Sequence, residues 1–182
     1  FKITSYLKRI YSGIGATKDS YNRVNIDISL VGVRTVQVNI IGEVKVPGTY
    51  SLSALSSVLN ALYASGGPTE NGTFRKVKVI RQGTSLGTFD IYKYLIEGSE
   101  EGNVLVRDQD KIIVSPYISR ITVVGSVKRP GLYELSKGET LKDLMNYFSG
   151  FKSDAYKERL IVERVNGTQK EVREILISDQ PN

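Results

Sequence analysis

The sequence predicts an α+β protein that consists of two tandem copies of one small module. The first observation behind this prediction is an internal repeat: residues 42–50 read GEVKVPGTY and residues 125–133 read GSVKRPGLY, 83 positions later (125 − 42). The two copies stay aligned without a gap, and 11 residues between 42 and 81 are identical at this offset. The second observation is that strand-type and helix-type periodicities follow in the same order in both copies. The chain therefore contains a duplication.

Each copy is predicted to open with a β-hairpin. Residues 35–40 (TVQVNI) alternate between polar and apolar side chains, which is typical of a half-buried strand. A return strand is expected after Pro47-Gly48, and after Pro130-Gly131 in the second copy. Proline and glycine suit the two central positions of a type II turn, in which the glycine takes a positive φ.

A helix is predicted after each hairpin. Ser56 or Ser57 is a suitable N-cap for the first helix, and Thr140 is suitable for the second. Apolar residues then recur at helical spacing, and we expect Gly67 and Gly150 to end the two helices.

Further strands are predicted to complete the module. The alternating segments 76–81 and 159–164 are expected to be strands, and Asn166-Gly167 is a strong hairpin signal after the second of them. In the first copy a short helix near 89–95 and a closing strand at 110–115 follow. A small mixed sheet around one helix is a β-grasp-like arrangement.

We expect three parts along the chain. Residues 1–33 are expected to be a lead-in helix and strand from a preceding unit, with the strand at 25–29. The first repeat is expected at 34–117, and the second at 118–182, where we expect the closing strand to be lacking. The lead-in helix is predicted from apolar residues at helical spacing, which are Ile3, Tyr6, Leu7, Ile10 and Ile14.

The composition argues against catalysis. The chain has no cysteine and no histidine, so thiolate nucleophiles, zinc–thiolate sites and the side chain best suited to proton transfer at neutral pH are absent. We find no carboxylate pair, nucleophile–base set or metal cluster, and therefore predict no catalytic residue, no metal, no cofactor and no enzyme. The net charge of +6 comes from scattered residues, so no nucleic-acid partner is expected.

The motifs resemble the soluble-ligand-binding β-grasp (SLBB) domains of bacterial polysaccharide export proteins. Both copies contain Gly-x-Val-Lys-x-Pro-Gly-x-Tyr-x-Leu. In the first copy the helix end ASGG at 64–67, the strand 75–81 and the closing segment 110–116 are also similar. The resemblance covers roughly residues 35–182. The second copy departs from the pattern at 147–150, where YFSG replaces the small residues.

This resemblance implies part of a larger, outer-membrane-associated protein on the periplasmic side of the outer membrane of a Gram-negative bacterium. In that family the repeats stack along an oligomeric ring. The implied partners are other copies of the chain, the inner-membrane polysaccharide export or copolymerase component, and the polysaccharide, with an acidic polymer as one option. The family's N-terminal export domain, lipid-attached cysteine and membrane-spanning segment are not recognisable here, so channel formation itself is not expected of these residues.

Three equivalent pairs of residues are candidates for ligand binding. The tyrosines could stack on sugar rings, or fill the packing face of each hairpin. The lysines precede the Pro-Gly turn, where they could contact a polymer or a subunit, or only serve solubility. The arginines could contact an acidic polymer, or form solvated ion pairs. The six candidates are Lys45, Tyr50, Arg81, Lys128, Tyr133 and Arg164.

Two functions remain as hypotheses. The leading hypothesis is a non-catalytic repeat segment for polysaccharide transport in capsule export, which contributes to assembly of an oligomeric channel and contacts the polymer. The alternative is a soluble-ligand receptor module that holds a carbohydrate or a cofactor between its two repeats. Oligomeric state and a concave pocket between the repeats would distinguish them.

Overall fold

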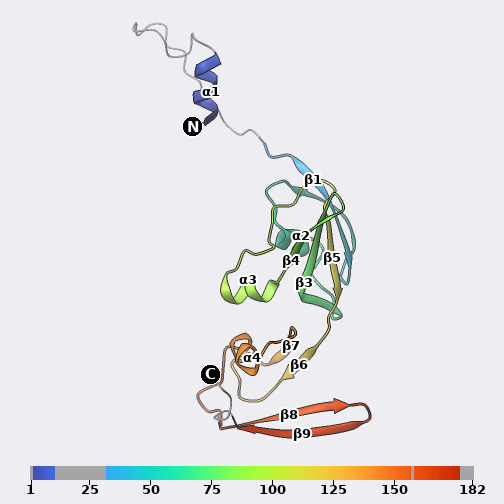
Figure 1. The fold of residues 1–182 in the computed structure, drawn as a ribbon, viewed down its shortest axis with the longest axis vertical. Coiled ribbons are helices and arrows are strands. Elements are labelled where there is room, and N and C mark those ends of the chain that lie inside the picture. The colour runs from blue at the N-terminus through green and yellow to red at the C-terminus, as the bar shows by residue number, and fades with distance from the viewer. Residues whose placement is uncertain (1, 11–31, 157, 177–182) are drawn as a thin grey trace. The chain divides into compact units, whose positions relative to one another are not determined.

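The computed structural model describes residues 2–10, 32–156 and 158–176 (Figure 1). The chain divides into two units, Phe1–Arg34 and Thr35–Asn182. In the first unit, helix α1 (Lys2–Ile10) confirms the expected lead-in helix as far as Ile10, whereas Ile14 and the strand expected at 25–29 lie outside the described residues. Within the described ranges no helix combines the length and the hydrophobicity needed to cross a membrane.

The second unit begins with a five-stranded mixed sheet. Its strand order is β2-β1-β5-β3-β4, so the strand that comes last in sequence lies at the centre. The central strand pairs parallel with β1 and antiparallel with β3. The expected α+β, β-grasp-like class is confirmed. The strands are β1 (Thr35–Gly42), β2 (Gly48–Ser53), β3 (Gly72–Arg81), β4 (Thr84–Phe89) and β5 (Lys111–Pro116).

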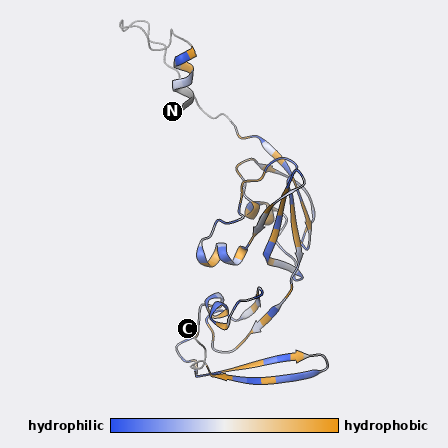
Figure 2. Cartoon of the chain, in the orientation of Figure 1, coloured by the Kyte–Doolittle hydropathy of each residue, from blue (hydrophilic) through white to orange (hydrophobic). Residues whose placement is uncertain are grey.

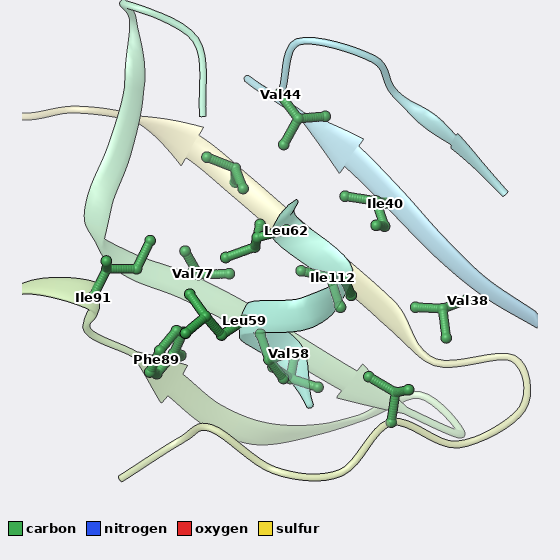
Figure 3. Close-up of a cluster of buried hydrophobic side chains, with 14 of the residues drawn as sticks. Val38, Ile40, Val44, Val58, Leu59, Leu62, Val77, Phe89, Ile91 and Ile112 are labelled. Atoms are coloured by element: carbon green, nitrogen blue, oxygen red, sulfur yellow. The ribbon is translucent and has the colours of Figure 1, made fainter. Parts of the chain in front are cut away.

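One face of this sheet packs against helix α2 (Val58–Ala64). Ser57 is the N-cap of this helix, and its backbone N–H and hydroxyl both donate to the side-chain oxygen of Asn60. Period-two alternation sends the apolar residues of the strands toward the helix, as Figure 3 shows for Val38, Val77 and Ile112. The core is therefore built from both hairpins, the central strand and α2.

A second short helix, α3 (Ile91–Glu97), follows β4 where the sequence predicted one. The side chain of Asp90 accepts hydrogen bonds from the backbone N–H groups of Tyr92 and Lys93, which fixes the helix start. Gly98 ends the helix in the left-handed conformation with φ 71°. The element order of the first repeat is the predicted order.

The predicted type II turns are wrong. Gly48 and Gly131 are the first residues of return strands, and neither has a positive φ. Gly48 is paired with Ile40 in the β1–β2 ladder, so it has extended backbone. The positive φ falls instead at Gly42 (φ 90°), where a Cβ atom would lie 2.1 Å from the carbonyl oxygen of Val114 in β5. The glycine permits the close approach of β1 and β5.

Within the described residues the second repeat has counterparts of β1, β2, α2, β3 and β4. Strands β6 and β7 form one two-stranded sheet, and β8 and β9 form another, with α4 between them in sequence. Both hydrophilic and hydrophobic residues occur along β8 and β9 (Figure 2). The elements are β6 (Arg120–Val123), β7 (Gly131–Glu134), α4 (Leu141–Tyr147), β8 (Arg159–Asn166) and β9 (Gln169–Leu176).

The duplication extends to individual hydrogen bonds. The backbone N–H of Lys45 donates to the carbonyl of Gly67, and that of Lys128 donates to Gly150, both at 3.0 Å. Thr140 caps α4 with a capping box, as Ser57 caps α2. The backbone contact at Gly150 forms despite the larger residues before it, so the departure of the second copy from the family pattern does not prevent it.

Candidate functional site at the repeat junction

The two candidate tyrosines occupy equivalent positions with equivalent bonds. The hydroxyl of Tyr50 donates to the carbonyl of Val46, and that of Tyr133 donates to the carbonyl of Arg129, each at 2.6 Å. Both rings are half-buried and pack on the core cluster of their own repeat. Each tyrosine thus holds its hairpin loop closed, and each hydroxyl hydrogen is already donated.

The two candidate lysines are exposed on the same loops. Lys45 lies against Gly66, where a Cβ atom would come within 3.2 Å of the lysine Cβ. Lys128 is exposed at the equivalent position of the second repeat. The structure places both ammonium groups on loop surfaces, as predicted from the sequence, and leaves their role in polymer contact as a prediction.

The two candidate arginines differ. Arg81 forms a bidentate ion pair with the fully buried carboxylate of Asp110, at 2.9 and 2.7 Å, and also donates to the carbonyl of Leu105. This hydrogen bond to Asp110, opposed by partial desolvation, raises the pKa of Arg81. Arg164 is exposed and makes no ion pair with any residue that the structure describes. Equivalent positions therefore have different environments.

The structure brings together a set of residues that sequence reasoning did not select. At its centre is Arg75 of β3, which is 4% exposed. Its Nε lies 2.8 Å from Asp90 of the first repeat, and its two terminal nitrogens lie 2.9 and 2.5 Å from the carboxylate oxygens of Glu139 of the second repeat. We call Arg75, Asp90 and Glu139, with the two tyrosines described next, the junction cluster.

Two tyrosine rings enclose the guanidinium group. The Arg75 Cζ lies 4.9 Å from the ring centroid of Tyr92 and 5.2 Å from that of Tyr147, and the two rings meet edge to face. The Tyr147 hydroxyl also donates to Glu139 at 2.6 Å. Tyr92 belongs to α3 and Tyr147 to α4, so one arginine joins both helices through charge and ring contacts.

Glu134 makes a second set of bonds across the junction. This buried carboxylate at the end of β7 accepts hydrogen bonds from the hydroxyl of Thr73 at 2.5 Å and from the backbone N–H of Phe74 at 2.8 Å. Arg120 of β6 donates to the carbonyls of Glu70 and Gly72. Every described buried polar side-chain atom in the chain has a partner. The polar contacts between the repeats are therefore satisfied.

The charges of the junction cluster stabilise one another. Burial acts against the charged form of Arg75, but hydrogen bonds to Glu139 and Asp90 outweigh it and raise its pKa. Burial likewise acts against ionised Glu139, while hydrogen bonds from Arg75, Tyr147 and Ser136 lower its pKa. Burial and the bond to Glu139 raise the pKa of Tyr147. At neutral pH the cluster contains a paired arginine and neutral tyrosines, an arrangement suited to holding two modules together.

One signal in the sequence could have identified Arg75. Val77 and Val79 of β3 point into the core, so period two places Arg75 and Thr73 on that same face. A charged residue at a core-facing strand position requires a buried partner. The partner residues could not be found in this way, because Glu134 and Glu139 correspond to Ser51 and Ser56 in the first copy.

A shallow depression lies beside the junction, between the end of α3 and α4. Its volume is about 480 Å³, and its lining includes Ile96, Glu97, Asp143 and Tyr147. Asp143 also forms the capping box with Thr140, and backbone and hydroxyl bonds from Thr140 lower its pKa. In the described part of the chain no group of three or more acidic side chains is arranged to hold a metal ion.

The similarity to known proteins covers both repeats. The SLBB domain family matches residues 37–89 and 120–172. Two proteins of Escherichia coli, each named polysialic acid transport protein KpsD, are 27% identical to this chain over 180 residues. The aligned region is 98% of this chain and 30% of each of those proteins, so the chain spans less than a third of their length. With two matched segments that cover more than half of its residues, the chain belongs to the SLBB domain family.

Proposed function

We propose that this chain is a non-catalytic segment of a polysaccharide export protein. The observation that carries the proposal is the pair of SLBB domains, together with similarity to a polysialic acid transport protein along 98% of the chain. The proposed place of action is the periplasmic side of the outer membrane. The proposed partners are other copies of the protein in a ring, the inner-membrane export component and the transported polysaccharide.

Within that protein, the repeats are proposed to act as a rigid element of the ring. A ring forms when a heterologous contact repeats with a rotation that closes, which requires subunits of fixed shape. The junction cluster supports this role because Arg75 binds carboxylates of both repeats and lies between two rings. The proposed division of the chain is 1–33, 34–117 and 118–182.

Sedimentation velocity of the full-length protein in detergent tests the assembly role. Deletion of residues 35–182 is expected to abolish a defined high-order oligomer. An oligomer that is unchanged by the deletion would contradict the proposal.

A narrower variant tests the rigid junction. Arg75→Met keeps the side-chain volume but removes the charge that joins Asp90 and Glu139, so we expect a broadened or smaller oligomer. Arg159→Met is the matched control, because Arg159 forms an ion pair with Glu174 that is half exposed on both sides. An oligomer that responds equally to both variants would show that charge, and not the junction, controls assembly.

The second candidate function is a receptor module for a soluble carbohydrate or cofactor. The observation behind it is the depression between α3 and α4, because it lies between the two repeats, where this alternative places its ligand. Under this alternative a monomeric protein would bind a mono- or oligosaccharide, and Asn146→Trp at the rim would block binding. Titration calorimetry with a panel of such sugars distinguishes this candidate from the assembly role.

A further inference from the structure

The five-stranded sheet has one face toward α2 and one face toward solvent. Val77 and Val79 of β3 are buried, and the residues that alternate with them, Lys76 and Lys78, are exposed. On β5, Ile112 and Val114 are buried while Lys111 is exposed. The three lysines therefore project from the face opposite the core.

The charge of this face has one sign. None of the strands β1–β5, which are described in full, contains an aspartate or a glutamate. The two arginines of these strands, Arg75 and Arg81, form ion pairs with buried or half-buried carboxylates, so their charges are neutralised. Lys76, Lys78 and Lys111 make no ion pair with a described residue. The strands therefore contribute only positive charge to the solvent side of the sheet, and Asp108, in the loop before β5, accepts a hydrogen bond from the backbone N–H of Gln37 at its edge.

The strand register arranges these lysines in a row. Lys111 of β5 is the pairing partner of Ile80 in β3, two residues beyond Lys78 on the same face. Adjacent lysines in the row are thus separated by roughly 7 to 8 Å, from the rise along a strand and the spacing between strands. A row of fixed positive charges on a rigid sheet suits a chain of negative charges.

Hydroxyl and amide side chains extend the same face. Lys111 is also the partner of Asn39 in β1, whose side chain accepts a hydrogen bond from Thr49 of β2 at 2.7 Å. Gln37 and Ser51 form the next cross-strand pair in the same orientation. Such groups donate to and accept from sugar hydroxyls. We call this surface, with the three lysines, the lysine face.

We propose that the lysine face binds an acidic polysaccharide, with sugar carboxylates against Lys76, Lys78 and Lys111 and sugar hydroxyls against the polar residues of β1 and β2. The inference rests on the proposed function and names its ligand class and site. A membrane surface is disfavoured as the partner, because proteins that bind at a membrane interface insert large, exposed apolar side chains. On the strands of the lysine face the most exposed large apolar side chain is Ile41, at 41%.

The second repeat differs at the positions that correspond to the two lysines of β3. At the offset of 83, Lys76 and Lys78 correspond to Arg159 and Ile161. Arg159 pairs with Glu174 at 2.8 Å, and the neighbouring Glu163 pairs with Lys170 at 2.7 Å. Arg173 pairs with Glu171 as well, so of the basic side chains on β8 and β9 only Arg164 makes no ion pair with a described residue. Polymer binding is therefore assigned to the first repeat.

The test compares two triple variants of the 182-residue chain. Lys76→Gln, Lys78→Gln and Lys111→Gln together remove the row. The matched control, Lys137→Gln, Lys142→Gln and Lys152→Gln, removes the same charge from exposed positions of the second repeat. Binding of polysialic acid is measured by biolayer interferometry, with neutral dextran, phosphatidylglycerol vesicles and duplex DNA as comparisons. Circular dichroism confirms that both variants are folded.

We expect the first variant to lose about ten-fold or more in affinity for polysialic acid and the control to lose about two-fold or less. Wild-type binding should weaken as the salt concentration rises, and dextran should not bind. Equal losses in the two variants, equal or tighter binding of vesicles or DNA, or no binding of polysialic acid would each overturn the inference. The proposed assembly role would still stand if deletion of 35–182 abolished the oligomer, so the two failures are distinguishable.

Discussion

The two repeats share hydrogen bonds in their hairpin loops, but among the described residues the hairpins are joined into one sheet in the first repeat alone. In the first repeat β5 lies between β1 and β3 and adds Ile112 and Val114 to the core. In the second repeat the two hairpins belong to separate sheets, and the buried core consists of Val127, Leu144 and Phe148. The comparison separates what each hairpin does alone from what the central strand adds.

The difference is clearest at equivalent positions. Phe89 is fully buried, whereas Val172, 83 residues later, is 59% exposed. Val38 is fully buried, whereas Ile121 is 39% exposed. The loop hydrogen bonds of Tyr50 and Tyr133 are the same in both repeats. The loop hydrogen bonds are therefore the same in both repeats, whereas the deeper burial is found where β5 lies between the two hairpins.

The largest expected effect concerns the core. Phe89→Ala should lower the free energy of unfolding of the first repeat by about 3–5 kcal/mol, because it removes a fully buried ring. Val172→Ala should cost less than about 0.5 kcal/mol, because that side chain is exposed. Urea denaturation followed by circular dichroism measures both. Similar losses at the two positions would mean that the second repeat has a core like the first.

The next effect tests the close approach of β1 and β5. Gly42→Ala should cost about 2–4 kcal/mol, since the new Cβ meets the Val114 carbonyl and the φ of 90° is unfavourable for alanine. Gly125→Ala has a φ of 97° and meets no atom within 4 Å, so about 1 kcal/mol is expected. Thermal unfolding of both variants measures the two losses of stability, which can then be compared. A larger cost at Gly125 would indicate that a strand also lies beside β6.

A third effect depends on pH. The pKa of Glu139 is lowered in the folded state, so its contribution to stability is present above its ordinary pKa, near 4.5, and is lost as the pH falls through the lowered folded value. Glu139→Gln should therefore cost about 1.5–3 kcal/mol at pH 7, and the difference from wild type should shrink below about pH 4.5. Urea denaturation from pH 3 to pH 7 would measure it.

Glu163→Gln is the control for this experiment, because Glu163 belongs to the exposed pair with Lys170. We expect it to change stability by less than about 0.5 kcal/mol at any pH. A pH-independent cost at Glu139 would mean that its packing matters and its charge does not.

The smallest expected effect concerns the tyrosine–carbonyl hydrogen bond that both hairpin loops contain. Tyr50→Phe and Tyr133→Phe each remove one hydroxyl that donates to a loop carbonyl, so each should cost about 0.5–1.5 kcal/mol. Hydrogen exchange of the 43–48 and 126–131 amides would report local opening of the loops. Unequal effects would show that the two hairpin loops are not independent of the rest of their repeats.

Much of the fold could be predicted from the sequence because its signals are local. Alternation identified the strands, and Ser57 and Thr140 identified the helix starts. The prediction of a type II turn at Pro47-Gly48 was wrong, because the conformation of Gly48 depends on its pairing with Ile40. The position of β5 at the centre of the sheet depends on contacts between segments that are distant in sequence. The periodicity of a single segment gives no information about such contacts.

The site was less predictable for a similar reason. Comparing the two copies selects residues that are shared, such as Tyr50 and Tyr133, whereas the contacts between the repeats use residues that differ between them. Arg75 corresponds to Glu158 in the second copy, and Glu139 corresponds to Ser56 in the first. An interface between two different surfaces leaves no repeated pattern, so only the structure brings these residues together.

The central place of β5 has a consequence for the order of events during synthesis. A nascent chain that ends before Lys111 already contains both hairpins of the first repeat and α2, yet it has no strand to pair with β1 and β3 together. Pairing between segments so far apart in sequence is slow, because the loop between them must be closed first. The first repeat can therefore complete its sheet only after residues 111–116 have left the ribosome.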